Sequence, residues 1–178
     1  MMFCCLRNCF DGFGFAATQI PKREPNPIAL DTSYMGHEVV IVKNGLRVCG
    51  RGGALTNAPL AQSKSYFEVK IQQGGIWAIG LATRSTDLNV TLGGNDIESW
   101  ALNSDVQEGD IIGVSYDHIE LNFYLNGKSM DSPVMGIKGT VYPVLYVDDG
   151  AILDLILDNF IHPPPTGFEK IMLEQSLL

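Results

Sequence analysis

The sequence predicts an all-β protein, built as a bent antiparallel β-sandwich of two sheets. Three observations favour this class: apolar and polar residues alternate along most segments, turn-forming dipeptides recur at short spacing, and few segments show the period of a helix. Strands that are apolar on one face and polar on the other are typical of two packed sheets. The 178 residues suit a single domain.

The first predicted hairpin joins Val39–Lys43 to Leu46–Cys49. Asn44-Gly45 between them is typical of a two-residue type I′ turn, because both central residues of that turn need a positive φ. The glycine-rich run Gly50–Gly53 follows directly. No Lys-Ser/Thr pair of a phosphate-binding loop comes after it, so we interpret the run as a β-turn or bulge.

The next predicted strand, Tyr66–Ile71, has a clear period of two. Its alternation directs Glu68 and Lys70 away from the core and directs the apolar side chains into it, namely Phe67, Val69 and Ile71. Gln73–Gly75 then predicts a hairpin turn into the apolar strand Ile76–Ala82.

Three further hairpin turns are predicted in the second half of the chain. Asp117-His118 follows the strand Ile111–Tyr116, Asn126-Gly127 ends the next strand, and Asp148–Gly150 follows the strand Val141–Val147. The strands after the first and third of these turns each have one apolar face, formed by Ile119, Leu121, Phe123 and Leu125 and by Leu153, Leu155 and Leu157.

The two ends of the chain differ from this pattern. Residues 1–27 mix Cys, Phe, Gly and Pro without a period, which predicts a flexible leader, and residues 28–162 form the predicted sandwich. Residues 163–178 begin with Pro-Pro-Pro-Thr-Gly. They predict a Pro-rich turn and a tail that packs on the domain, either as one short amphipathic helical turn or as extended chain.

The net charge of −8 is unevenly distributed. Residues 1–84 hold nine Lys/Arg and five Asp/Glu, whereas residues 85–178 hold three and fifteen. A nucleic-acid surface needs clustered basic side chains, so we exclude this class of partner. The acidic half is interpreted as a solvated surface that keeps the domain soluble, or as a patch that attracts a basic partner.

The sequence predicts no catalytic residues, no metal site and no cofactor. The three histidines are His37, His118 and His162. We interpret the Asp117-His118 pair as a turn rather than as a catalytic histidine base oriented by an aspartate. No Gly-x-Ser-x-Gly motif is present. The acidic residues near Gly150 lack the spacing of a calcium loop: Asp148, Asp149, Asp154 and Asp158.

Three of the four cysteines lie near the N-terminus: Cys4, Cys5 and Cys9. Charged residues interrupt this stretch, so it does not resemble a signal peptide, and a reducing, cytoplasmic location is expected. The three thiols either stay free or accept palmitoyl chains, in which case two or three chains would attach the protein to a membrane. Cys49 reads as a small apolar strand residue.

Five segments, in this order along the chain, resemble motifs of the SPRY domain family: Tyr66–Val69, Trp77–Ala82, Glu108–Val114, Leu121–Gly127 and Val141–Val144. The resemblance implies a bent antiparallel sandwich that acts as a non-enzymatic module and binds a peptide or protein loop through inter-strand loops. We also expect the domain to be a monomer. Three inter-strand loops, Arg84–Asn89, Gly93–Asp96 and Tyr146–Gly150, carry polar residues after apolar strands. We expect them to supply the partner-binding set: Arg84, Asp87, Asn89, Asn95, Asp96, Tyr146, Asp148 and Asp149.

A lectin-like or small-ligand sandwich is the alternative function, since similar architectures hold sugars. One departure from the family pattern affects both readings. Ser99–Asp105 runs almost directly into Val106–Asp110, where family members have roughly twenty more residues. The neighbouring sheet edge is therefore expected to differ from that of the family.

Overall fold

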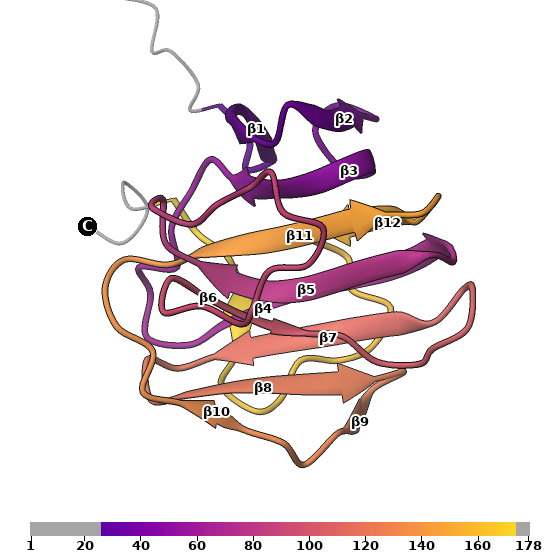
Figure 1. The fold of residues 1–178 in the computed structure, drawn as a ribbon. Helices are drawn as coiled ribbons and strands as arrows, with labels where there is room; N and C mark the ends of the chain where they lie inside the picture. Colours follow the sequence, from indigo (N-terminus) through magenta and orange to yellow (C-terminus); the bar gives the residue numbers. More distant parts are fainter. Residues whose placement is uncertain (1–25, 174–178) are drawn as a thin grey trace, which may run out of the picture.

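The computed structural model describes residues 26–173, and these residues form strands, turns and loops without a helix (Figure 1). None of these residues therefore forms a helix that could cross a membrane. The strands are β1 (Leu30–Met35), β2 (Glu38–Val42), β3 (Arg47–Thr56), β4 (Ser65–Gln73), β5 (Ile76–Ala82), β6 (Ser99–Leu102), β7 (Ile111–Tyr116), β8 (Glu120–Leu125), β9 (Lys128–Ser129), β10 (Val134–Met135), β11 (Tyr142–Asp148), β12 (Ile152–Ile156) and β13 (Glu169–Lys170).

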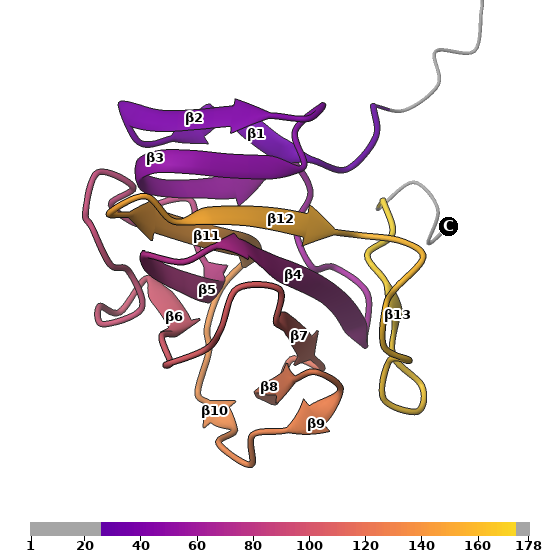
Figure 2. The ribbon, with the colours of Figure 1, turned by 90° about the vertical axis from the view of Figure 1, so that its right-hand side faces the viewer.

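The strands form two layers, which Figures 1 and 2 show from perpendicular directions. Sheet A contains β1, the second half of β3, β11, β5 and β6. Sheet B contains β2, the first half of β3, β12, β4, β7, β8, β9, β10 and the short β13. All of these pairs are antiparallel except β13 with β4. The predicted fold class, a bent antiparallel sandwich, is confirmed.

Strand β3 belongs to both sheets because it bends at its glycine-rich centre. Its Val48 pairs with β12 in sheet B, whereas its Leu55 pairs with β11 in sheet A. Gly50 and Gly52 have φ values of 96° and 120°, which residues with a side chain rarely adopt. A Cβ on Gly52 would also lie 2.5 Å from the Leu88 carbonyl oxygen. The predicted turn or bulge is therefore a bend within one continuous strand.

Three of the five predicted hairpins are present. Asn126-Gly127 alone joins β8 to β9, with φ values of 49° and 81°. Strands β7 and β8 pair around Asp117-His118. Strands β2 and β3 also pair, but Val42 lies opposite Arg47, so four residues close this hairpin and the predicted two-residue turn is wrong.

The other two predicted hairpins are connections between the sheets. Gln73–Gly75 joins β4 in sheet B to β5 in sheet A, and Asp148–Gly150 joins β11 in sheet A to β12 in sheet B. The Gln73 side-chain amide donates to the Gly150 carbonyl oxygen at 2.8 Å, so the two connections lie side by side. A glycine-rich turn reverses the chain both in a hairpin and in a connection between sheets. The sequence of the turn therefore does not show to which sheet the next strand belongs.

The predicted core face of β4 is confirmed, because Phe67, Val69 and Ile71 are at most 1% exposed. Its opposite face is not solvated as expected, since Glu68 is fully buried. Ile119, which was expected in the core, lies in the β7–β8 turn and is 65% exposed. Alternation fixes which side chains share a face, but it does not show what covers that face.

The cover over Glu68 is the C-terminal strap, which we define as residues 158–172 and which Figure 2 shows beside β4 with its strand β13. The Glu68 carboxylate accepts hydrogen bonds from the backbone N–H of Ile161 at 2.7 Å and of His162 at 2.9 Å, and from the Tyr66 hydroxyl at 3.1 Å. Gln62 donates to the Lys170 carbonyl oxygen. The strap is thus extended chain rather than a helical turn.

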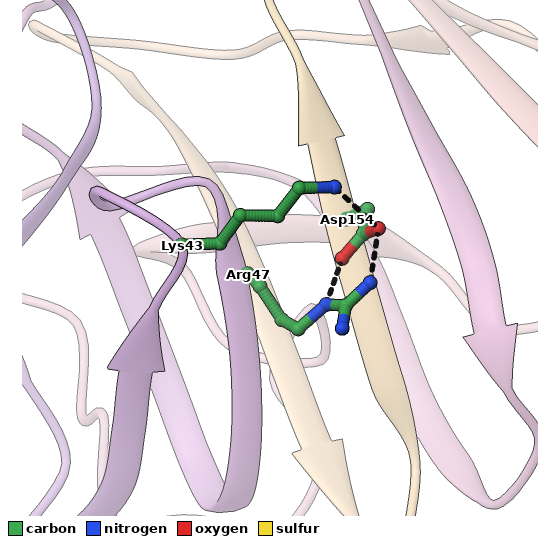
Figure 3. Close-up of polar contacts among 3 residues, drawn as sticks. All are labelled: Lys43, Arg47 and Asp154. Atoms are coloured by element: carbon green, nitrogen blue, oxygen red, sulfur yellow. Dashed lines mark hydrogen bonds and ion pairs between the residues drawn. The ribbon is translucent and has the colours of Figure 1, made fainter.

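The outer face of sheet B also holds an ion cluster between β3 and β12 (Figure 3). The Asp154 side chain is 9% exposed and lies 2.5 Å from the Arg47 Nε and 3.3 Å from the Lys43 Nζ. The Arg47 hydrogen bonds, supported by Lys43, hold the Asp154 pKa below its ordinary value. This carboxylate therefore joins the β2–β3 hairpin to β12.

Replacing Gly52 by Ala should destabilise the fold through the β3 bend. We expect a loss of about 3 kcal/mol in the free energy of unfolding, from an unfavourable φ and a backbone clash. Gly109→Ala is the matched control, because Gly109 also has a positive φ but has no atom within 4 Å of its Cβ position. The control should lose only about 1 kcal/mol. Equal losses in urea unfolding would contradict the bend.

Replacing Asp154 by Asn should reduce stability in a pH-dependent way. At pH 7 we expect a loss of about 2 kcal/mol, less than for a fully buried pair because the two cations are partly exposed. The folded pKa is lowered, so the wild-type advantage is complete above the ordinary value of 3.8 and is lost as the pH falls through the folded pKa. Urea unfolding of both proteins at neutral and acidic pH checks this, and a gap that does not close in acid would refute it.

Candidate functional site

The β5–β6 loop, residues 83–98, lies against the outer face of sheet A and runs across β11 in Figure 1. Tyr146 on β11 fixes it there. The Tyr146 side chain is fully buried, and its hydroxyl lies 3.1 Å from the Thr86 Oγ1 and 3.3 Å from the Asp87 carbonyl oxygen. A Cβ on Gly53 or Gly93 would collide with its ring. Burial raises the Tyr146 pKa, so the hydroxyl stays a neutral hydrogen-bonding group.

Local hydrogen bonds set the shape of the β5–β6 loop. The Asp87 carboxylate accepts from the Asn89 N–H at 2.9 Å, and the Asp96 carboxylate accepts from the Glu98 N–H at 2.9 Å and the Ser99 hydroxyl at 2.8 Å. The Leu88 carbonyl oxygen accepts from the Gly53 N–H of β3. These bonds make the loop a fixed part of the domain rather than a free connection.

The β5–β6 loop, the β1–β2 turn and the β3 bend meet at a shallow pocket of about 180 Å³. Its lining side chains are His37, Glu38, Arg51 and Asn89. The Asn89 side-chain oxygen accepts from the His37 N–H at 2.9 Å. The Arg51 Nε lies 3.5 Å from an Asp148 carboxylate oxygen, so the β11–β12 connection borders the same region.

Arg84, the second residue of the loop, is held by two aromatic rings. Its guanidinium carbon lies 3.8 Å from the centre of the Tyr34 ring and 4.5 Å from the centre of the Tyr142 ring. Such contacts between a cation and an aromatic face are favourable, and they position the guanidinium without requiring a carboxylate. The arginine is itself solvent-exposed.

The structure brings the predicted site residues to one face but separates them into two groups. Arg84 lies near Tyr142 at the start of β11, whereas Asp148 and Asp149 follow at its end, about 20 Å away at 3.4 Å per residue. The exposed members of the predicted set along this face are Arg84, Asp87, Asn89, Asn95, Asp96 and Asp149, with Asp148 half-buried. We call these side chains the loop face.

Tyr146 is a correction to the predicted site, because a fully buried side chain offers a partner no contact surface. It supports the loop instead. The sequence did not identify Tyr34, Tyr142, Arg51 or His37 near the loop face, since β1, the β1–β2 turn, β3 and the start of β11 come close to the loop only through the strand order of sheet A. Cys4, Cys5 and Cys9 lie outside the described residues.

The histidines have structural neighbours. The His118 Nε2 lies 2.8 Å from the Gln62 carbonyl oxygen, and the His162 Nδ1 lies 3.4 Å from the buried Glu68 carboxylate. His37 borders the shallow pocket. Within residues 26–173, no three His, Cys, Asp or Glu side chains gather as metal ligands would.

Comparison with known proteins places this geometry in a family. A model of the SPRY domain matches residues 64–108. SPRY domain-containing protein 7 of Gallus gallus is 52% identical over 194 residues, which cover 99% of this chain and 97% of that protein. The Homo sapiens protein of the same name is 50% identical, with the same coverage. An alignment of 194 positions leaves at least 16 that the 178 residues here do not fill.

Solved structures share the fold at low sequence identity. The TRIM65 PSpry domain superimposes with a TM-score of 0.58 and 14% identity, covering 74% of this chain and 90% of that one. Stonustoxin gives the same score and identity, covering 73% of this chain and 28% of that one. These two matches show the shared fold, and the near full-length identity above means that the chain belongs to the SPRY domain family, within the group of SPRY domain-containing protein 7.

Proposed function

We propose that this chain is a non-enzymatic interaction module that binds a short peptide or a protein loop on its loop face. The main support is that the β5–β6 loop is ordered and yet exposes polar side chains. Buried Tyr146 fixes this loop to sheet A, while the polar side chains of the loop remain exposed. A loop that is already ordered lowers the entropic cost of binding. SPRY domains generally mediate protein interactions, which supports the same reading.

The charge of the loop face favours a partner segment with basic or hydrogen-bond-donating groups. Asp87, Asp96, Asp148 and Asp149 contribute four carboxylates to this face. Two of them also form turns within the loop, because Asp87 and Asp96 accept backbone hydrogen bonds. Asp149 is exposed, and attraction from such rim charges acts mainly on the association rate.

The aromatic side chains favour a peptide over a sugar at this face. A sugar ring needs a free aromatic platform, but Tyr146 is buried and the rings of Tyr34 and Tyr142 lie against Arg84. The lectin-like alternative therefore receives no support from the described residues near the loop.

A random peptide library displayed on phage and selected against the full chain tests the proposed function. We expect selected peptides to bind, and to associate several-fold more slowly with the variant Asn95→Lys/Asp149→Lys, with a weaker dependence on salt. The matched control is Asn103→Lys/Asp105→Lys, which changes the charge equally on the exposed β6–β7 connection. If no peptide is selected, or if both variants behave alike, the loop face is not the binding surface.

We also propose a cytoplasmic location with attachment to membranes through acylation of Cys4, Cys5 and Cys9. Two or three acyl chains would anchor the protein stably, whereas one would bind only marginally. A palmitate analogue should label the wild type and should not label the variant in which all three are changed to Ser. Cys49→Ser is the control and should keep the label, because Cys49 lies on β3. An unlabelled wild type would exclude the attachment.

A further inference from the structure

We infer that Arg84 receives an acidic side chain of the bound segment, and that this segment carries a basic residue about six positions away. The inference rests on the proposed function and specifies the chemistry of the partner. It concerns the two ends of the loop face: the arginine between Tyr34 and Tyr142, and the aspartates of the β11–β12 connection.

Arg84 differs from the other described arginines in its partners. Arg47 binds Asp154, and Arg51 lies near Asp148. Within residues 26–173, by contrast, no carboxylate lies within ion-pair distance of Arg84. The side chains of Tyr34 and Tyr142 hold its charge in place instead, with ring centres 3.8 Å and 4.5 Å from the guanidinium carbon.

Arg84 is nevertheless exposed, so part of the hydrogen-bonding edge of its guanidinium is accessible to a partner. A guanidinium has five N–H donors, which lie in its plane and point outward. Two of these donors match the two oxygens of a carboxylate, and an arginine that is already positioned loses less entropy on binding. Tyr and Arg are also the residue types that most often dominate the energy of protein interfaces.

The opposite end of the loop face has the opposite charge. Asp149 is exposed and Asp148 is half-buried next to Arg51. The length of β11, from Tyr142 to Asp148, separates the two ends by about 20 Å at 3.4 Å per residue. An extended segment covers this distance with about six residues at 3.3–3.6 Å each. A segment with one acidic and one basic residue at that spacing therefore complements both ends.

The peptides selected from the phage-displayed library described above test this inference. We expect Asp or Glu to be enriched at one position and Lys or Arg about six positions away. Changing the acidic residue to its amide should weaken binding to the wild type about tenfold, the range of one charge-assisted contact. The same change should have little effect on binding to Arg84→Gln. Lys128→Gln, on the distant β9, is the control and should respond like the wild type.

The Arg84 Nε–H resonance of the wild type gives a second measurement, which remains informative if Arg84→Gln does not fold. It should shift with the acidic peptide and not with its amide form. Selected peptides without an acidic preference, or without this shift, would overturn the inference and leave the proposed function standing. A library that yields no binding peptide would instead overturn the proposed function.

Discussion

Strand β3 bends at its glycine-rich centre and thereby joins the two sheets of the sandwich. Its first half pairs with β12 in sheet B and its second half pairs with β11 in sheet A. One continuous strand therefore connects the two packed layers. Two positions of the bend accept only glycine, since the Leu88 carbonyl oxygen and the Tyr146 ring lie where Cβ atoms of Gly52 and Gly53 would be. The same close approach brings the β5–β6 loop down onto sheet A. Fold and candidate site thus share one cause.

The outer faces of the two sheets are covered in different ways, and this difference decides where binding is expected. The C-terminal strap covers part of sheet B with buried hydrogen bonds to Glu68 and Gln62, so these polar groups are already satisfied within the chain. The β5–β6 loop covers sheet A but keeps most of its own polar side chains exposed. A partner that replaced the strap would have to compensate for several buried hydrogen bonds, whereas a partner on the loop face would not.

The sequence predicted the fold class and most strands, because alternation and Asn-Gly turns are local signals. It could not distinguish the hairpin at Asn126-Gly127 from the connection at Asp148–Gly150, because both reverse the chain and only the sheet order separates them. The sequence also does not show which strands lie beside the β5–β6 loop, so part of the candidate site was not predicted. The loop residues were predicted, but Tyr34 and Tyr142 come from strands distant from the loop in sequence, and the sequence did not show that the β5–β6 loop buries Tyr146.

We expect a partner to bind the loop face rather than the face under the C-terminal strap. Backbone amide chemical shifts of the full chain, mapped with a library-selected peptide, distinguish these two surfaces. Binding on the loop face should change the amide shifts of residues 84–96 and 148–150 and leave those of the strap, residues 158–172, unchanged. Changes confined to the strap and to β4 beneath it would place the binding surface on sheet B instead.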